Sequence, residues 1–229
     1  MTTSGVTALS LTARTIIETA LREINAIPVG QDADAAEVEP IITTLNMMIK
    51  GWETSGPHLW RVTEGSVAVT PVTMSYSLSA DNPIRLKEVR FRYADGHDLP
   101  MKKLSRTKYV TLPNKNSQGV STQWYFDPQE ASQSLYVWPI LATSTTERLV
   151  YTYQRRFQIC TSLNDTLDIP NEWHDTVMYC LAERLLPRYG QETASAQRIE
   201  RRAQMLLRQA KAFDRPDCLY MMPEKRFST

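Results

Sequence analysis

The sequence has little cysteine and little glycine. Its cysteines, Cys160, Cys180 and Cys218, are odd in number, widely spaced and without any CxxC pair. Such a set fits neither a disulfide framework nor a zinc site, so we expect free thiols in a reducing compartment. Eight glycines in 229 residues form no GxGxxG or GxxxxGKS/T loop of the kind that holds phosphates. We therefore predict no cofactor and no metal.

Long hydrophobic runs are also missing. No apolar run approaches the ~20 residues that span a bilayer, and no apolar segment with a basic flank opens the chain. We predict no membrane partner and synthesis as a soluble cytoplasmic product. The 42% of hydrophobic residues suffice for a core without cross-links, in one globular unit or two tightly joined lobes.

Catalytic constellations are equally scarce. No HExxH or HxH spacing occurs among the histidines, which are His58, His97 and His174. Two carboxylate pairs, Asp127 with Glu130 and Asp165 with Asp168, have residue types that glycoside hydrolases use. Asp beside Pro, Thr or Leu is more typical of turns and caps. We predict that the chain is not an enzyme, with a lytic hydrolase as a minor alternative.

The net charge of +1 hides a gradient along the chain. Residues 1–60 hold three bases and seven acids, whereas residues 188–229 hold nine bases and five acids. The densest basic run is in the middle of the chain and consists of Lys102, Lys103, Arg106 and Lys108. This run is either a solvated charged face or a surface that contacts DNA phosphates. The near-neutral total charge argues against a dedicated DNA-binding protein.

Helical periodicity marks both ends of the chain. Apolar residues at steps of three, four and seven predict a helix over 12–26, capped by Ser10 or Thr12 and ended by Pro28. A second helix starts near Asp32 or Asp34 and continues to Trp52, with Pro40 in its first turns or at a bend.

The C-terminal part contains two more predicted helices. The first follows Asn171, a good N-cap, and ends at Pro187 or Gly190. The second runs from about Glu192 to Phe213. Its inward face is predicted to consist of Ile199, Leu206, Ala210 and Phe213.

The block between these helical parts alternates with a period of two. Six short runs show the pattern of strands with one buried face: SVAVT, MSYSL, IRLKEVRFRY, TQWYF, SLYVWP and RLVYTYQ. Residues 94–97 supply a turn through Gly96, and 105–110 form a short helix. We interpret this block as an antiparallel β lobe.

The predicted fold class is α+β, mainly α. Four helices form a bundle, with an inserted antiparallel β lobe and an extended C-terminal tail. The expected domains are 1–61 (helices 1 and 2), 62–156 (β lobe), 157–214 (helices 3 and 4) and 215–229 (tail). The tail is rich in proline and large apolar residues without helical period, so we predict that it docks on a partner. Its predicted docking residues are Arg215, Leu219, Tyr220, Met221, Lys225, Arg226 and Phe227.

Several motifs together resemble the head-to-tail adaptor family of tailed bacteriophages. Leu45-Asn46-Met47-Met48 with Trp52 is similar to the family's second helix, and Leu135-Tyr136-Val137-Trp138-Pro139 to one of its strands. The sharpest match is the run DTLDIPNEW over 165–173, followed by LPRYG over 186–190. The matching motifs cover most of the chain, and their specificity comes from their order and spacing.

The resemblance implies a structural virion protein at the head-to-tail junction. It implies a ring of twelve copies beneath the portal that joins capsid to tail and lines the DNA channel. The implied partners are other copies of the chain, the portal protein, a tail nozzle or tail tube or terminator protein, and genomic double-stranded DNA that passes without sequence specificity. The alternatives are another virion ring protein, such as a tail nozzle or stopper, and a nucleic-acid-binding module.

Overall fold

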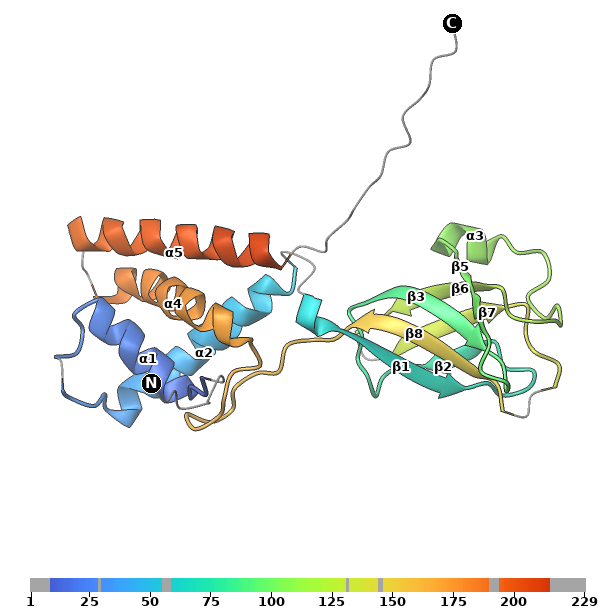
Figure 1. The fold of residues 1–229 in the computed structure, drawn as a ribbon, viewed down its shortest axis with the longest axis horizontal. Coiled ribbons are helices and arrows are strands. Elements are labelled where there is room, and N and C mark those ends of the chain that lie inside the picture. The colour runs from blue at the N-terminus through green and yellow to red at the C-terminus, as the bar shows by residue number, and fades with distance from the viewer. Residues whose placement is uncertain are drawn as a thin grey trace, which may run out of the picture. The chain divides into compact units, whose positions relative to one another are not determined.

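The structure is a computed structural model that describes residues 9–28, 30–54, 59–130, 132–143, 146–189 and 194–214. It divides into two compact units (Figure 1). The helical unit contains residues 1–59 and 158–229, and the β unit contains Trp60–Phe157. The predicted α+β class is confirmed, because helices dominate one unit and strands the other.

The N-terminal half of the helical unit contains α1 (Ala13–Glu23) and α2 (Ala35–Trp52). The Thr12 hydroxyl accepts from the N–H of Thr15, and the Asp34 carboxylate accepts from that of Ala36. Each bond satisfies an N–H that the first helical turn leaves open. Each cap is one of the two candidates that the sequence left open, Ser10 or Thr12 and Asp32 or Asp34. Pro40 lies inside α2 near its start, which is one of the two positions expected from the sequence, the first turns or a bend.

The C-terminal half contains the 3-10 helix η2 (Asn171–Trp173), α4 (His174–Tyr189) and α5 (Ala194–Phe213). Asn171 does not cap this helical segment, since the N-cap is Pro170 without a side-chain hydrogen bond. Pro187 lies inside the last turn of α4 and does not end it. A proline there loses one backbone hydrogen bond, but α4 stops only at Tyr189.

Phe213 also differs from the prediction, because its side chain is 76% exposed. The buried stripe of α5 consists of Ala196, Ile199 and Ala203. Ten residues at 100° each place Phe213 about 80° around the helix from Ala203. The predicted inward face therefore no longer contacts α4 at the end of α5.

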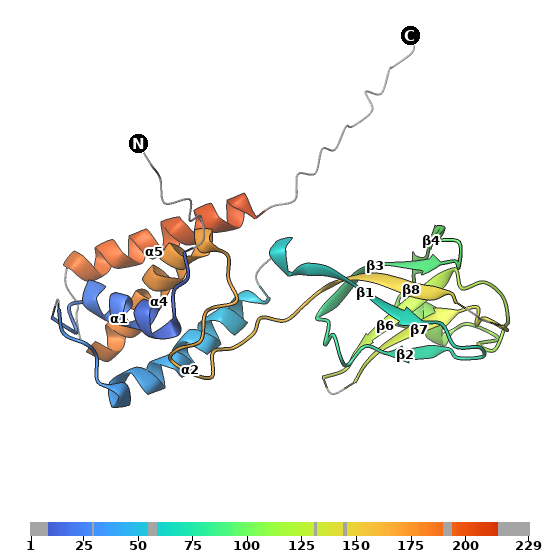
Figure 2. The same cartoon turned by 60° about the horizontal axis from the view of Figure 1, so that its bottom comes forward.

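The helices pack pairwise, and α4 is central. It contacts α5 on one side and α1 and α2 on the other, and α1 also contacts α2. Figure 2 places α5 and α2 on opposite sides of this unit. The closed four-helix bundle and the extended tail stay predictions.

The β unit consists of two four-stranded sheets. The first has the order β1 (Val62–Ala68), β8 (Arg148–Gln154), β3 (Arg85–Arg92) and β4 (Asp98–Pro100). The second has the order β2 (Ser75–Ser77), β7 (Gln133–Trp138), β6 (Gln123–Pro128) and β5 (Lys102–Lys103). The 3-10 helix η1 (Leu59–Arg61) precedes β1, and the short helix α3 (Arg106–Val110) follows β5.

All six predicted strand segments contain strands, but the lobe is not wholly antiparallel. Strand β5 pairs in parallel with β6, through Lys102 with Gln123 and Lys103 with Trp124. Strands β4 and β5 were not predicted, because three and two residues are too short to show alternation. The predicted turn at Gly96 is present, with a φ of 88°.

Side chains from both sheets form one core. Its large members include Phe91, Trp124, Leu135 and Leu149, each at most 1% exposed. Indole Nε1 of Trp124 donates to the carbonyl oxygen of Met101 at 3.2 Å, so its one polar group is paired. This core is what an alternating pattern on two facing sheets produces.

Gly65 of β1 makes room for an aromatic ring in the neighbouring strand. A Cβ at this position would lie 2.6 Å from Cε2 of Tyr151, closer than carbon atoms approach. The Tyr151 hydroxyl donates to the Asp81 carboxylate. Burial and this carboxylate raise the pKa of Tyr151, so the phenol remains protonated.

Candidate interaction surfaces

The first helix is joined to the loop that precedes α4. The N–H of Ala13 donates to the carbonyl of Asp165 at 2.8 Å, and that of Arg14 to the carbonyl of Leu163 at 3.0 Å. An isolated antiparallel bridge links Thr12 with Thr166. Two open N–H groups at the start of α1 are thus satisfied by a segment about 150 residues later in the chain.

The two carboxylates of the loop stabilise its backbone. Asp165 accepts from the N–H groups of Thr161 at 2.7 Å and Ser162 at 2.8 Å, which lowers its pKa. Asp168 accepts from the N–H of Gln158 at 3.1 Å. Carboxylates that accept from nearby backbone N–H groups act as caps. The contacts therefore agree with the interpretation of this carboxylate pair as part of a turn and cap sequence.

The other proposed carboxylate pair also belongs to a turn. Asp127 is in β6 and accepts from the amide of Gln129 at 2.9 Å, and Glu130 follows it as an exposed residue. Over the described ranges, no three His, Cys, Asp or Glu side chains gather in a way that would hold a metal ion.

A polar clasp joins α2 to the segment that returns from the β unit. Asn46 donates from Nδ2 to the carbonyl of Cys160 at 2.8 Å and accepts from the N–H of Cys160 at 3.0 Å. One side chain thereby pairs both backbone groups of a residue 114 positions away. Sequence reasoning missed this contact, and its only signal was an asparagine within an amphipathic helix.

The described cysteines, Cys160 and Cys180, are buried and free, as expected. Burial raises the pKa of both thiols, and that of Cys180 reaches about 12. A buried thiol of such high pKa is a poor nucleophile. Cys218 lies outside the described residues.

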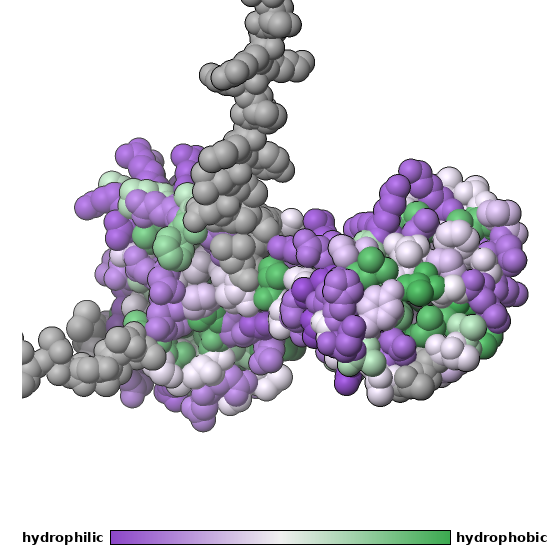
Figure 3. Space-filling view, turned by 45° about the vertical axis from the view of Figure 1, so that its right-hand side comes forward, coloured by the Kyte–Doolittle hydropathy of each residue, from purple (hydrophilic) through white to green (hydrophobic). Residues whose placement is uncertain are grey.

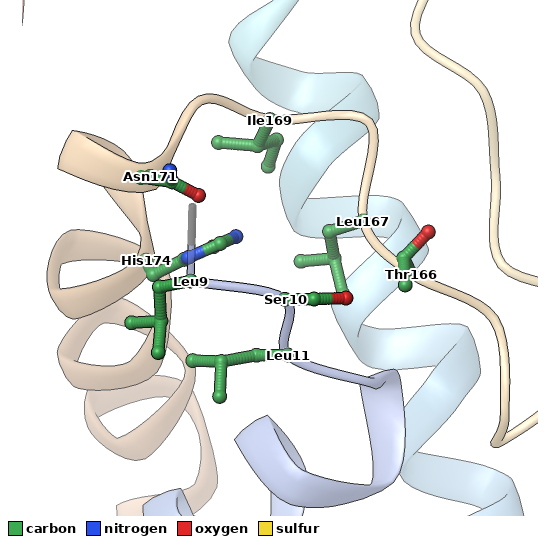
Figure 4. A pocket seen from close by; sticks show the side chains of 8 residues that line it. All are labelled: Leu9, Ser10, Leu11, Thr166, Leu167, Ile169, Asn171 and His174. Atoms are coloured by element: carbon green, nitrogen blue, oxygen red, sulfur yellow. The ribbon is translucent and has the colours of Figure 1, made fainter. Parts of the chain in front are cut away.

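A pocket of about 220 Å³ lies between the segment before α1 and the start of α4 (Figure 4). Its lining residues are Leu9, Ser10, Leu11, Thr166, Leu167, Ile169, Asn171 and His174. With its amide oriented to pair, Asn171 donates to the carbonyl of Leu9 at 2.9 Å and accepts from the N–H of Leu9 at 3.3 Å. The pocket walls thus belong to the same junction that joins α1 to the loop.

His174 is the buried histidine of the described chain. It is 6% exposed, and its Nδ1 has no hydrogen-bond partner among the described residues. Burial lowers its pKa, so the imidazole is neutral at pH 7. His97 lies in the turn after β3, stacked on Tyr93, and His58 lies outside the described residues. The histidines of the described chain do not form a catalytic group.

A second cavity of about 210 Å³ lies between the beginning of α4 and the end of α5. Its apolar lining includes Trp173, Leu206, Ala210 and Phe213. The predicted docking residues of the tail follow directly in the sequence. These residues, Arg215, Leu219, Tyr220, Met221, Lys225, Arg226 and Phe227, lie outside the described residues, and their role stays a prediction.

The predicted basic patch lies on one edge of the β unit. Lys102 and Lys103 form the edge strand β5, and Arg106 and Lys108 follow in α3, which Ser105 caps. All four side chains are exposed, and none makes an ion pair with another described residue. No acid occurs anywhere from residue 99 to residue 126.

Aromatic rings position one cation of this patch, Lys103, and the nearby Lys115. Lys103 Nζ lies 5.3 Å from the ring centroid of Trp124, and Lys115 Nζ lies 5.2 Å from that of Tyr109. Tyr109 also stacks on Tyr125. Cation–π contacts of this kind restrict lysine side chains that would otherwise move freely. On the face of the β unit in Figure 3, hydrophilic and hydrophobic side chains are interspersed.

No described helix has the length and apolar character needed to cross a membrane.

Three solved structures of gene transfer agent particles have chains with weak similarity to this one. A chain in the structure titled "Neck of empty GTA particle computed with C6 symmetry" is 14% identical, with a TM-score of 0.30, over 85% of this chain and 93% of that one. A chain in the corresponding native neck, computed with C12 symmetry, is 15% identical with a TM-score of 0.28, over 85% and 94%. A chain in the native virion is 13% identical with a TM-score of 0.29, over 86% and 94%. Similarity at this level does not establish a shared fold.

No curated protein shows significant similarity to the chain. The family model described as SU10 adaptor protein matches residues 11–223, which includes almost all of both units. Our two expectations, a virion adaptor and not an enzyme, are thereby confirmed. The chain belongs to the SU10 adaptor protein family and is a structural protein of the head-to-tail junction of a virion.

Proposed function

We propose that the protein forms a ring of twelve copies beneath the portal, joins the capsid to the tail and lines the channel through which DNA passes. The observation that carries this proposal is the family match across both units. The absence of a catalytic constellation among the described side chains is consistent with a mechanical role. In such a ring, weak contacts are repeated by symmetry, and their sum holds the junction closed.

The proposed division of labour follows the two units. The helices form the wall of the ring, as a four-helix bundle with contacts between adjacent copies. The β unit contacts the tail component below, a nozzle, tube or terminator protein. The segment after Asp214 extends to the portal and places Leu219, Tyr220, Met221 and Phe227 in grooves of that partner, with Arg215, Lys225 and Arg226 beside them.

The basic patch fits this role if the β unit faces the channel. Four exposed cations per copy become a charged belt when a ring repeats them. A belt without acids attracts the phosphate backbone in any sequence. Tight binding would stop the genome from sliding, and the chain's net charge of +1 is consistent with weak contact.

The tail-docking part is tested by mixing the purified chain with purified portal rings and separating the complexes by size. We expect the full chain to migrate with the portal and a chain that lacks residues 215–229 to migrate alone. A matched control replaces Ser228 and Thr229 by Ala and should bind as the full chain does. Undiminished binding by the truncated chain would refute tail docking.

A second experiment separates the adaptor from a nucleic-acid-binding module. Short duplex DNA is titrated with the isolated chain at two salt concentrations. An adaptor should bind weakly at low salt and not measurably at physiological salt. Tight, salt-dependent binding that is lost when Lys102, Lys103, Arg106 and Lys108 become Ala would favour the module.

A further inference from the structure

The outward face of α5 carries a basic stripe. At steps of three, four and three residues, Arg198, Arg201, Met205 and Arg208 lie opposite the buried stripe of Ala196, Ile199 and Ala203. Met205, the apolar member of the stripe, is 41% exposed. Hydrophilic side chains project from the upper edge of the helical unit in Figure 3, where α5 lies.

The three arginines of this stripe have no acidic partner among the described residues. Arg198 donates only to the carbonyl of Ala194, one turn earlier. Arg202, just off the stripe, does pair with Asp175 of α4 at 3.7 Å. Arginine is also the cation that protein interfaces favour, because its planar group binds carboxylates with two parallel hydrogen bonds. The stripe is therefore a basic surface whose counter-charge is not supplied by the described part of its own chain.

The outward face of α2 has an uncharged exposed stripe, and acids gather only around the start of the helix. Its exposed residues Ala36, Pro40, Thr43 and Met47 recur at steps of four, three and four, and Met47 is 65% exposed. The acids Asp32, Asp34, Glu37 and Glu39 surround the start of this helix, and no base occurs from residue 25 to residue 49. Small side chains with one exposed methionine make a flat surface on which another helix can lie.

The same face contains a glycine that its own chain does not explain. Gly51 is exposed in the last turn of α2, and an added Cβ would meet nothing within 4 Å. Glycine destabilises a helix relative to alanine, so a packing reason inside the chain would be expected and none is present among the described residues. Close approach of another chain is a sufficient reason.

The two faces lie on opposite sides of the helical unit. α5 packs on α4, which also contacts α1 and α2. Figure 2 shows α5 along one side of this unit and α2 along the other. A contact between unlike faces on opposite sides of a subunit is heterologous, and repeated contacts of this kind close into rings or continue as filaments.

We propose that the basic stripe of α5 in one copy packs on the outward face of α2 and its acidic start in the next copy, with Met205 and Met47 inside the contact. The proposal rests on the ring of the proposed function and names the surfaces that would form it. The partner is a second copy because each copy presents both complementary charges, on similar lengths of helix. Arg198 and Arg201, on one side of Met205, meet the carboxylates at the start of α2, and the two methionines are removed from water.

Disulfide trapping tests the proximity of the two methionines. Cys218 is first replaced by Ser in all variants, and the buried Cys160 and Cys180 remain. Met47→Cys and Met205→Cys chains are then mixed under mild oxidation and analysed by intact mass. We expect a mixed dimer linking positions 47 and 205. The matched control pairs Met205→Cys with Ile159→Cys, which is 51% exposed in the same unit and should not link. Equal linking in the control, or none at position 47, would overturn the proposal.

Charge reversal tests the electrostatic complementarity. One variant carries Arg198→Glu, Arg201→Glu and Arg208→Glu, and a second carries Asp32→Lys and Glu39→Lys. Asp34 and Glu37 are left unchanged, because Asp34 caps α2 and Glu37 accepts a hydrogen bond from Tyr189. We expect each variant alone to self-associate at least about tenfold more weakly than the wild type, because like charges then face each other. Their equimolar mixture should regain association, which also shows that both are folded. As a control, Glu200→Lys changes the charge of α5 off the stripe and should have little effect.

The outcomes separate this contact from the proposed function. A ring on the portal whose assembly is unaffected by both reversals would refute the contact and leave the adaptor role intact. A link between positions 47 and 205 in a chain that does not join the portal would support the contact and contradict the role. Reversed variants that assemble normally alone, or a mixture that does not recover, count against the contact.

Discussion

The two units of the chain are stabilised in different ways. The β unit is continuous in sequence, from Trp60 to Phe157, and two facing sheets share one core rich in aromatic side chains. The helical unit is assembled from both ends of the chain. Its halves are joined by side-chain and backbone hydrogen bonds, such as those of Asn46 with Cys160 and of α1 with the 163–165 loop.

This difference has a consequence for how the units depend on each other. Bringing two distant segments together requires closure of a long loop, which lowers chain entropy. The folded β unit occupies that loop and shortens the effective separation of the two halves. We therefore expect the β unit to tolerate loss of the helical clasp, whereas the helical unit should depend on the β unit.

The largest expected effect is on the core of the β unit. Trp124→Ala removes a fully buried ring and leaves the Met101 carbonyl unpaired, which should lower the free energy of unfolding by about 3–5 kcal/mol. Urea unfolding with hydrogen exchange would show lost protection in both units. Trp138→Ala, a half-buried residue whose Nε1 donates to the Asn114 carbonyl, should have a smaller effect. Equal effects would contradict the account of the core.

The next effect is on the clasp of the helical unit. Asn46→Ala leaves both backbone groups of Cys160 without their side-chain partner and should lower stability by about 1–3 kcal/mol. Hydrogen exchange should show the loss in α2 and the 158–170 segment, with the β unit unchanged. Arg184→Ala, at an exposed position of α4, is the control and should leave exchange as in the wild type. Equal loss of protection in the β unit would show that the units do not differ as described.

A smaller effect distinguishes the units by pH. Burial lowers the pKa of His174, so below about pH 6.5 the unfolded chain binds a proton that the folded chain does not. The free energy of unfolding should therefore fall as pH decreases from 7 to 5, by at most ~1.4 kcal/mol per pH unit from this group. Urea midpoints measured between pH 7 and pH 5 report this pH dependence. In His174→Phe, the part of the pH dependence that comes from His174 should be absent. His97→Phe, in the exposed turn of the β unit, should retain it, and an unchanged slope in His174→Phe would refute the assignment.

The smallest effect concerns a turn of the β unit. Val72 is 60% exposed and has a φ of 57°, a left-handed conformation that a β-branched residue adopts only under strain. Val72→Gly should raise stability by about 0.5–1 kcal/mol, the relief of strain less the entropy that glycine loses. Thermal unfolding measures the gain, and Val120→Gly, without a positive φ, should show none. A loss of stability in Val72→Gly would mean that the side chain contributes contacts that outweigh the strain.

The sequence predicted the parts of the fold that depend on local pattern. Periods of 3.6 and two located the main helices and strands, and Thr12 and Asp34 cap their helices as residues of their type do. Strands β4 and β5 were missed because pairing with long neighbours, not their own sequence, makes them strands. Asn171 was interpreted as a cap, but its amide instead pairs with Leu9, a choice that depends on a segment 162 residues earlier.

The interaction surfaces show the same limit. The basic patch was found because its four cations lie close together in sequence, between residues 102 and 108. The complementary stripes of α2 and α5 were visible only as a charge gradient between the chain ends. Their opposite placement required the helix packing. The contacts of Asn46 with Cys160 and of Ala13 with the Asp165 carbonyl join distant segments, and nothing in a local pattern indicates the partner.

The most direct test of the central claim is an image of the assembled junction. Particles or purified neck complexes that contain the chain are imaged by electron cryomicroscopy without imposed symmetry. The account predicts a closed ring of twelve copies between the portal and the first tail component, with the channel open for DNA. Finding the chain elsewhere in the particle, or as separate copies that do not close into a ring, would contradict it.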